Sequence, residues 1–418
     1  MRIQLVPRAA QVDLLDLPWN EPLEEWESTR LVDVPRGIGR HVVRFVDDEG
    51  VFYALKELPS EIAAREYRLL RALDARGIAA VDAVGVVSDR HRTGGGEELP
   101  DVLITRYLEF SLPYRLALAR HPLPDQLERL LDAFAQLLVR LHLTGFFWGD
   151  CSLSNALFRR DAGELAAYLV DAETGELHPR LSDGQREWDL QIAEENVFGE
   201  LLDMAAEAGD DAATPDPEAL AAEIPRRYRL LWDELTADEE LGDVRGERLE
   251  QRLRRLNELG FDADEIEIVE TDGGFRMRVE PAVVEAGHHR RRLLHLTGLD
   301  AQENQARRLL ADIDAFRVAL ERAGRPAPSD AAAAGRWLAE VFEPALAAVP
   351  PELRAKRDAA QLYHELLDHR WYLSEQAGRE VPLEDAVRSY VDTVLRELPD
   401  ERTVLGLSGA DPYGLGYG

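Results

Sequence analysis

One segment of the chain, LHLTGFFWGDCSLSNALFRRDAGELAAYLVDAETG, constrains the fold more than any other. It follows a long amphipathic helix and contains Asp150 and Asn155, five residues apart, in the loop that leaves this helix. The run after Asn155 predicts a strand, a turn at residues 161–163 and a second strand that ends near Asp171. Because the strands of a hairpin pair antiparallel, Asn155 and Asp171 are expected at the same end of it.

This arrangement predicts Asp150, Asn155 and Asp171 around one point. Carboxylate and amide oxygens suit a hard cation such as Mg²⁺, which combines few protein oxygens with phosphate oxygens and water. A carboxylate just upstream of the metal ligands, that of Asp150, is placed to orient an incoming hydroxyl group. The pattern therefore indicates a metal site beside a group that acts on a hydroxyl.

A second pair of charged residues lies upstream, in a predicted strand and helix. Residues 30–58 favour two strands joined by a turn at residues 47–50. The second strand, VFYALKEL, contains Lys56, one of only two lysines in the chain. In the helix predicted over residues 60–75, Glu66 shares a stripe with leucine and isoleucine side chains. A carboxylate on an interior face is costly unless it is paired, so we predict an ion pair between Lys56 and Glu66.

These features together resemble the protein-kinase-like fold: a strand lysine, a helix glutamate, Gly-Asp followed by Asn, and a hairpin that ends in Asp. The similar variant is the one found in aminoglycoside phosphotransferases and in bacterial lipopolysaccharide (Kdo) kinase-like proteins. The resemblance covers about the first half of the chain. It implies an α+β fold with a two-lobed kinase-like domain, and ATP and Mg²⁺ as cofactors.

The resemblance implies a role for each residue of the pattern. Lys56 would hold the α- and β-phosphates of ATP, and Glu66 would position it. Asp150 would be the catalytic base. Asn155 and Asp171 would be the Mg²⁺ ligands.

The resemblance also assigns the nucleotide-binding segments. Gly37 and Gly39 of PRGIGRHV would belong to the loop that covers the nucleotide. Tyr107 and Glu109 of TRYLEF would lie at the adenine-binding hinge, within a strand predicted over residues 101–110. Asp189 of REWDL resembles the buried aspartate that braces the catalytic loop.

Three positions depart from the pattern of ordinary protein kinases. Trp148-Gly149 stands where His-Arg is usual, which favours the small-molecule kinase branch. DAE stands where DFG is usual, so Glu173 is either a second metal carboxylate or a solvated side chain. The glycine loop lacks a third glycine. These departures leave a catalytically inactive, nucleotide-binding pseudokinase or scaffold as the alternative function.

Composition limits the kinds of partner that the chain can bind. The 418 residues carry 80 acidic and 49 basic side chains, a formal charge of −31, which argues against nucleic-acid backbones or anionic membranes as main partners. The single cysteine, Cys151, excludes an intrachain disulfide and fits a reducing compartment. No stretch approaches the roughly 18 apolar residues of a membrane span. We therefore expect a cytoplasmic protein.

The chain length predicts at least two domains. After the kinase-like domain we expect a mainly helical domain with a β-hairpin about Asp272-Gly273. It resembles a bacterial domain of unknown function that occurs fused to kinase-like halves. The expected boundaries are 1–209 for the kinase-like domain (small lobe 28–110, large lobe 111–209), 210–222 for a linker, 223–400 for the helical domain and 401–418 for a disordered tail.

Three other motifs invite a functional interpretation. GHHRRRLLH (287–295) could bind phosphate, nucleic acid or metal, but we favour a helix face paired with acidic residues. HELLDH (364–369) has its second histidine one residue too late for a zinc-binding HExxH helix. The aromatic residues of RWYLSE (370–375) are expected in the core, and Cys151 is expected to be a packing residue.

The sequence thus predicts an ATP- and Mg²⁺-dependent phosphotransferase that acts on a hydroxyl group. Sugars, aminoglycoside-like compounds, lipids and protein hydroxyls all stay open as acceptors. A weaker third hypothesis is a nucleic-acid-binding module centred on Arg290, Arg291 and Arg292, which requires a steep salt dependence of binding. The oligomeric state is left open.

Overall fold

The computed structural model describes residues 1–7, 14–32, 41–94, 96–118, 124–208, 216–237, 239–241, 251, 262–271, 274–282, 288–325, 329–398 and 401. The chain forms two compact units. The first unit comprises Met1–Phe158 and Ala167–Arg229, and the second unit comprises Arg159–Ala166 and Leu230–Thr403.

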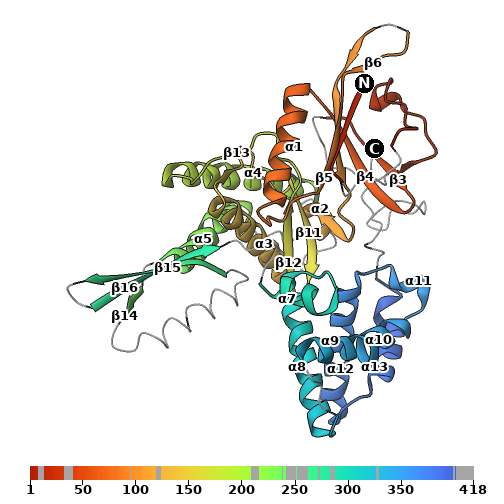
Figure 1. Ribbon diagram of the computed structural model, residues 1–418, viewed down its shortest axis with the longest axis vertical. Coiled ribbons are helices and arrows are strands. Elements are labelled where there is room, and N and C mark those ends of the chain that lie inside the picture. Colours follow the sequence, from red (N-terminus) through yellow and green to blue (C-terminus); the bar gives the residue numbers. More distant parts are fainter. Residues whose placement is uncertain are drawn as a thin grey trace. The chain divides into compact units, whose positions relative to one another are not determined.

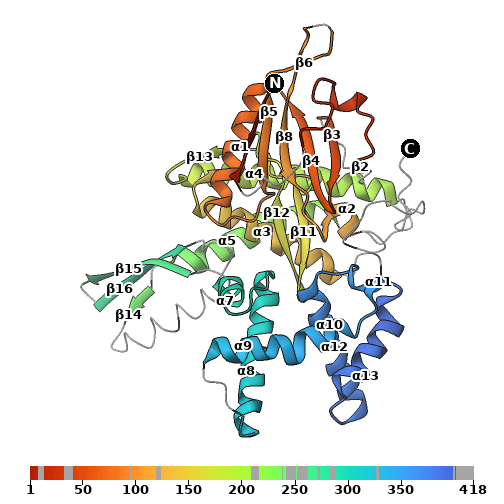
Figure 2. The ribbon, with the colours of Figure 1, turned by 45° about the vertical axis from the view of Figure 1, so that its right-hand side comes forward.

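The first unit begins with a six-stranded antiparallel sheet in the order β1-β5-β8-β4-β3-β2. Its strands are β1 (Arg2–Leu5), β2 (Leu31–Val32), β3 (Val43–Asp48), β4 (Val51–Leu58), β5 (Ala83–Ser88) and β8 (Asp101–Arg106). The turn predicted between β3 and β4 is present, with Gly50 at a φ of 86°. Helix α1 (Ser60–Asp74) packs on β4, β5 and β8 (Figures 1 and 2).

The sheet starts upstream of the predicted small lobe, which was expected over residues 28–110. Strand β1 pairs with β5, and the short helix η2 (Leu23–Glu25) belongs to the core beneath the sheet together with Trp19 and Trp26. The fully buried guanidinium of Arg90 donates to the carbonyl oxygens of Trp19 and Glu21. Residues before 28 are therefore part of the small lobe.

The large lobe of the first unit is mainly helical. Its elements are α2 (Tyr114–Ala117), α3 (Pro124–Leu143), α4 (Asp183–Ala208), α5 (Pro217–Thr236), β9 (Ser111–Pro113), β10 (Phe146–Phe147), β11 (Ala156–Asp161), β12 (Glu164–Leu169) and β13 (Glu176–Leu177), and the small lobe adds β6 (Arg90–His91) and β7 (Glu98–Leu99). The tip of the β11–β12 hairpin and the end of α5 from Leu230 belong to the second unit. The predicted apolar face of α3 is buried. After α3 the chain turns at Gly145, where a Cβ would lie 2.1 Å from the His178 carbonyl oxygen, so only glycine fits.

Helix α5 begins at Pro217, inside the segment that the sequence predicts as a linker. Its buried residues Ala221, Ile224 and Tyr228 follow at helical spacing, which explains why a proline-containing segment is helical here. Residues 210–215 lie outside the described residues. Among the described helices, none combines the length and apolarity that a bilayer crossing requires.

The second unit is mainly helical and contains a hairpin, as predicted. Its strands are β14 (Glu239–Leu241), β15 (Asp262–Thr271) and β16 (Gly274–Ala282); its helices are α7 (His288–Thr297), α8 (Glu303–Arg322), α9 (Asp330–Trp337), η3 (Leu338–Phe342), α10 (Glu343–Ala347), α11 (Pro351–Arg354), α12 (Ala359–Ala377), α13 (Leu383–Tyr390) and η4 (Val391–Leu395). Strands β15 and β16 pair up to Thr271 and Gly274, on either side of the predicted turn.

Two expectations for the second unit are wrong. Trp371 and Tyr372 were expected in the core but are 65% and 52% exposed, because the buried face of α12 is formed by residues such as Tyr363 and Leu366. Glu401 was assigned to a disordered tail but is buried, and it accepts a hydrogen bond from Arg160 Nε at 2.9 Å. The rest of that tail, 402–418, lies outside the described residues.

Candidate functional site

The predicted ion pair between Lys56 and Glu66 is present in the first unit. Lys56 Nζ of β4 lies 3.1 Å from Glu66 Oε2 of α1. The same ammonium lies 2.6 Å from Asp171 Oδ2 and 3.5 Å from Glu173 Oε2, both in the segment after β12. Glu66 Oε1 also accepts a hydrogen bond from the Ala172 backbone N–H at 3.4 Å. One lysine therefore joins a strand, a helix and the end of the hairpin.

The charges of this cluster do not balance. Oxygen atoms of Glu66, Asp171 and Glu173 lie within 4.8 Å of one another, around a single ammonium. Burial raises the pKa of the Glu66 carboxyl, the charge of Asp171 raises it further, and Lys56 opposes both. Burial alone would lower the pKa of Lys56, but the charges of Glu66 and Asp171 outweigh it and raise that pKa. A proton on Glu66 or an additional cation at this point would each relieve the surplus of negative charge.

Asp150 and Asn155 lie side by side in the loop after β10. The amide nitrogen of Asn155 donates to both the backbone oxygen and Oδ2 of Asp150, each at 3.1 Å. These two bonds use the amide nitrogen of Asn155, so its amide oxygen, the atom that a hard cation binds, stays out of them. The Asp150 carboxylate is thereby held in one orientation.

The hairpin places Asn155 and Asp171 at one end, as predicted. The backbone N–H of Val170 donates to the Asn155 carbonyl at 3.0 Å, so the strands are still paired one residue before Asp171. The indole Nε1 of Trp148 donates to the Asp171 carbonyl at 3.0 Å. Trp148 thus connects the loop of Asp150 to the segment of Asp171.

Asp189 of α4 holds the loop of Asp150 through hydrogen bonds to its backbone, as the resemblance implied. Its fully buried carboxylate accepts the backbone N–H of Trp148 at 2.7 Å and that of Gly149 at 2.8 Å. It also bonds His142 Nε2 at 3.1 Å, and His142 Nδ1 bonds the Tyr228 hydroxyl at 2.9 Å. Burial lowers the pKa of His142, so a neutral ring that donates from Nε2 and accepts at Nδ1 satisfies both partners.

Two further residues of α4 hold the loop of Asp150, and the sequence patterns did not predict this role for them. Asn196 Nδ2 donates to Asp150 Oδ1 at 3.3 Å and to the Cys151 carbonyl at 3.1 Å. The Glu200 carboxylate accepts the backbone N–H groups of Leu153 and Ser154, each at 2.8 Å. Asp189, Asn196 and Glu200 are spaced by seven and four residues, which puts them on one helix face. This helical spacing from Asp189 is the sequence pattern that could have indicated the role of Asn196 and Glu200.

These loops, with a strand lysine and a helix glutamate beside them, bring together the residues on which the kinase-like resemblance rests. Residues 48–196 match the lipopolysaccharide kinase (Kdo/WaaP) family model. The match contains Lys56, Glu66, Asp150, Asn155 and Asp171, and it confirms the kinase-like resemblance. Residues 230–395 match a domain of unknown function, DUF4032, which confirms the second resemblance.

The chain is similar to a solved structure described as WaaP in complex with acyl carrier protein, at 18% identity and a TM-score of 0.37, over 62% of this chain and 99% of that one. None of the curated proteins compared with the chain matches it.

Of the glycine-loop and hinge residues proposed for nucleotide binding, Tyr107 and Glu109 lie within the described part of the chain. Gly37 and Gly39 lie outside the described residues. Tyr107 follows the end of β8 at Arg106, so the strand predicted over 101–110 is shorter, and the chain turns at Phe110 with a φ of 58°. The Tyr107 ring packs edge-on against two phenylalanines, and burial together with the charge of Glu109 raises its pKa to about 12.

The Glu173 carboxylate lies beside His41 and Lys56 and is not a solvated side chain. Its Oε2 lies 3.0 Å from His41 Nε2, in the segment that follows the glycine loop. Its backbone N–H donates to Asp171 Oδ1 at 3.0 Å. Glu173 is thus part of the carboxylate cluster, and its role as a weaker metal ligand remains a prediction.

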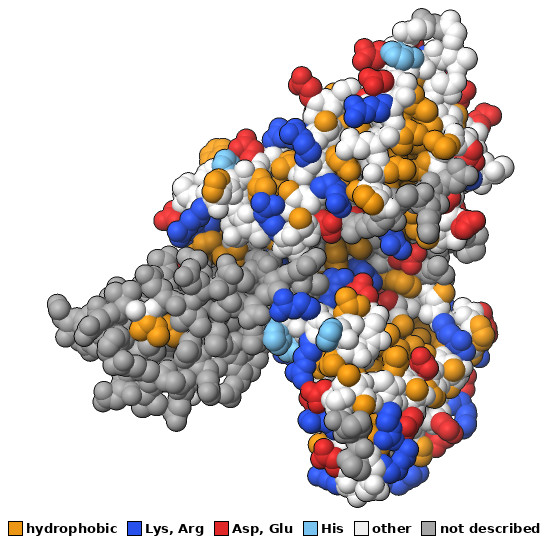
Figure 3. Space-filling view, in the orientation of Figure 1, with side chains coloured by type: hydrophobic (Ala, Val, Ile, Leu, Met, Phe, Trp, Pro, Cys, Tyr) orange, Lys and Arg blue, Asp and Glu red, His pale blue; other side chains and the backbone are white. Residues whose placement is uncertain are grey.

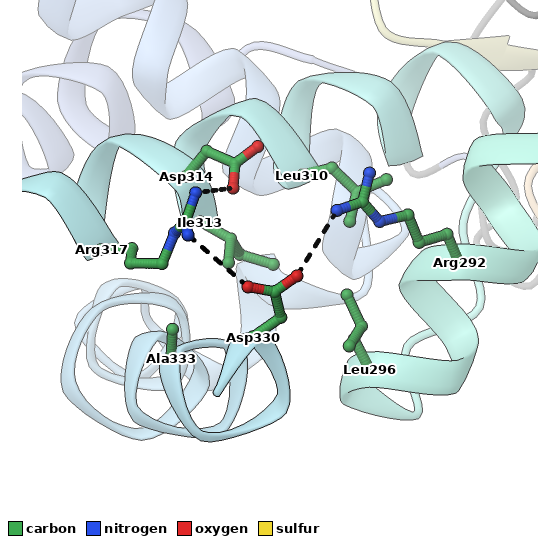
Figure 4. A pocket seen from close by; sticks show the side chains of 8 residues that line it. All are labelled: Arg292, Leu296, Leu310, Ile313, Asp314, Arg317, Asp330 and Ala333. Atoms are coloured by element: carbon green, nitrogen blue, oxygen red, sulfur yellow. Dashed lines mark hydrogen bonds and ion pairs between the residues drawn. The ribbon is translucent and has the colours of Figure 1, made fainter. Parts of the chain in front are cut away.

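The basic cluster of the second unit is paired with acidic residues, as we favoured. His289 Nδ1 lies 2.7 Å from Glu303, and Arg290 lies 2.7 Å from Asp300. In Figure 4, Asp330 lies between Arg292 and Arg317 with an ion pair to each. Basic and acidic side chains are interspersed over these helices on the face seen in Figure 3. This neutralised surface does not favour the nucleic-acid hypothesis.

The remaining motifs have structural partners. Burial raises the pKa of the Cys151 thiol, which fits a packing residue and opposes a thiolate. His364 is buried and pairs with Asp368 at 3.1 Å, whereas His369 bonds the Ser389 hydroxyl at 2.9 Å.

Proposed function

We propose that this chain is an ATP- and Mg²⁺-dependent phosphotransferase that transfers the γ-phosphate to a hydroxyl group of a sugar or another small molecule. The observation that carries the proposal is that the Lys56 ammonium contacts the carboxylates of both Glu66 and Asp171. The β11–β12 hairpin also brings Asn155 to the same end as Asp171. The kinase family match supports the reaction class. A cytoplasmic location, with access to ATP, belongs to the same proposal.

The residues present fit a divalent cation. Three carboxylates surround one ammonium, and the amide oxygen of Asn155 stays out of the bonds to Asp150. Asp171 and Asn155 would hold Mg²⁺, with Glu173 as an additional carboxylate. When bound, the ion would neutralise charge on the triphosphate.

The side chains of the chain itself supply positioning. Lys56, held by Glu66, would bind the α- and β-phosphates. Asp150, oriented by the amide nitrogens of Asn155 and Asn196, would accept a hydrogen bond from the acceptor hydroxyl. The acceptor oxygen would bond to the γ-phosphorus as the bond to the β,γ-bridging oxygen breaks. The hydroxyl proton would pass to Asp150 and ADP would leave.

One observation favours the alternative, a nucleotide-binding pseudokinase. Glu173 stands where the DFG motif of protein kinases has glycine, and its Oε2 lies 3.5 Å from Lys56 Nζ, so an additional carboxylate lies at the site proposed for the phosphates. In such a protein the second unit would engage a partner.

ADP release distinguishes the two functions. The full chain is incubated with ATP, Mg²⁺ and a panel of sugars, aminoglycosides, lipids and protein acceptors, with EDTA as the control. Acceptor-stimulated ADP release that EDTA abolishes supports the phosphotransferase. ATP-dependent thermal stabilisation that requires Mg²⁺, with no ADP release on the whole panel, supports the pseudokinase.

A further inference from the structure

The hairpin of β11 and β12 is divided between the two units. Its base, up to Phe158 and from Ala167, belongs to the first unit, and its tip, Arg159–Ala166, belongs to the second unit. The two strands lie side by side in Figures 1 and 2. Because Asn155 and Asp171 flank the base, one short hairpin carries both the proposed metal ligands and part of the second unit.

At the tip, Asp161 caps the N-terminus of α8. Its Oδ2 accepts the backbone N–H and the side-chain nitrogen of Asn304, each at 3.0 Å, and its Oδ1 accepts the Gln305 N–H at 2.7 Å. The first N–H groups of a helix have no partner inside the helix, and a carboxylate there also interacts favourably with the helix dipole. Asp161 is 3% exposed, and it lies 144 residues from Gln305 in the sequence.

Two buried glutamines bond the backbone of the same tip. Gln305 Nε2 donates to the Arg160 carbonyl at 2.9 Å and to Gln361 Oε1 at 3.0 Å. Gln361 Oε1 in turn accepts the Ala162 N–H at 3.1 Å. Three consecutive residues at the tip, 160–162, are therefore hydrogen-bonded to residues of α8 and α12. We call this set, Asp161, Asn304, Gln305 and Gln361, the hairpin clasp.

The hairpin clasp differs from an ordinary hairpin turn in the burial of its polar groups. A turn normally exposes its polar groups to water, whereas here a carboxylate and two amides are buried and depend on one another for hydrogen bonds. A buried network of this kind tolerates few alternative geometries, because a displaced member leaves unsatisfied polar groups behind. Movement of the tip is thus tied to the start of α8.

We infer that the second unit controls the phosphotransfer site through the hairpin clasp, with Asp161 as the positioning residue. This inference rests on the proposed function. When the clasp is closed, the tip is fixed and the strands hold Asn155 and Asp171 in register; when it opens, both ligands lose that restraint. Because coupling between two sites is reciprocal, a nucleotide bound at the first unit also protects the clasp.

Hydrogen exchange and Mg·ADP binding, both measured on the full chain, test the inference. The variants are Asp161→Ala, the milder Gln361→Ala, and Arg308→Gln as a control that removes an exposed ion pair of α8. Asp161→Ala is expected to speed exchange at the amides of 155–157 and 170–173, and to weaken Mg·ADP binding by about fivefold or more. Arg308→Gln is expected to change neither. Asp161→Asn, which keeps one acceptor oxygen, is expected to recover part of the affinity.

Each outcome decides the inference. If Asp161→Ala loosens 303–306 but leaves exchange at 155–157 and 170–173 unchanged, the clasp only stabilises the second unit and the inference is wrong. If Asp161→Ala does not fold, the same comparison is made with Gln361→Ala. If the wild-type chain binds no Mg·ADP, the proposed function fails, and the exchange rates still show whether the clasp restrains the hairpin base.

Discussion

Lys56 Nζ lies 2.6 Å from Asp171 Oδ2, although the two residues are 115 positions apart in the sequence. With Glu66 at 3.1 Å, the ammonium joins β4, α1 and the segment after β12. An ammonium is a compact charge with three donors, whereas a guanidinium is a larger, planar fork whose geometry matches a bidentate carboxylate or phosphate best. Carboxylates that approach from different elements are therefore suited to lysine.

Lys56→Arg is expected to impair ATP use, with a loss of about 100-fold in kcat/KM for ATP. The larger, planar head cannot take the place of the ammonium among Glu66, Asp171 and Glu173 without displacing them. Steady-state kinetics of ADP release measures the loss. Arg68→Lys, an exchange of the same two residue types on the exposed side of α1, serves as the control and should leave kcat/KM unchanged. Wild-type kinetics in Lys56→Arg would contradict the assignment.

Asp150→Asn is expected to lower phosphate transfer by about 100-fold or more while ATP binding persists, because the variant cannot accept the hydroxyl proton. Transfer is measured as ADP release, and binding as thermal stabilisation by Mg·ATP. Asp203→Asn, an exposed residue of α4, is the matched control. Equal turnover in Asp150→Asn and wild type would remove Asp150 from the mechanism.

Asp189→Asn is expected to lower the free energy of unfolding of the first unit by about 2 kcal/mol. The amide group has one acceptor oxygen, so the backbone N–H of either Trp148 or Gly149 is left buried and unsatisfied. Urea denaturation followed by tryptophan fluorescence measures the loss. Tyr228→Phe removes one bond to His142 at the edge of the same network and should cost about half as much. A larger loss in Tyr228→Phe would contradict this ranking.

The contribution of Asp161 to the stability of the second unit is expected to decrease as the pH rises from 4 to 6. Burial raises the pKa of Asp161 to about 6 from 3.8, and the hydrogen bonds from Asn304 and Gln305 oppose that shift. Since the folded chain binds more protons than the unfolded chain in this window, the free energy of unfolding decreases as pH rises, by about 3 kcal/mol in total, and then levels off. Asp161→Asn should lack this component. The measurement is the difference in unfolding free energy between wild type and variant across pH, and a constant difference from pH 4 to pH 7 would contradict the assignment.

Much of the candidate site could be predicted from local patterns. Helical spacing placed Glu66 on an interior face, and strand pairing placed Asn155 and Asp171 at one end of a hairpin. Local patterns failed where the outcome depended on distant partners. Trp371 and Tyr372 are exposed because other residues of α12 face the core. Lys356, the second lysine, donates to three carbonyl oxygens at the end of η4, a use that no local pattern indicates.

The sequence by itself determined the elements, the faces they bury and the residue types of a phosphotransfer site, because periodicity and turn chemistry act over a few residues. Only the tertiary structure decided which side chains meet. Asn196 and Glu200 became supports of the Asp150 loop, and Asp161 became the cap of α8, because chain segments far apart in sequence were brought together. A hydrogen bond forms between groups about 3 Å apart in space, whatever their separation along the chain.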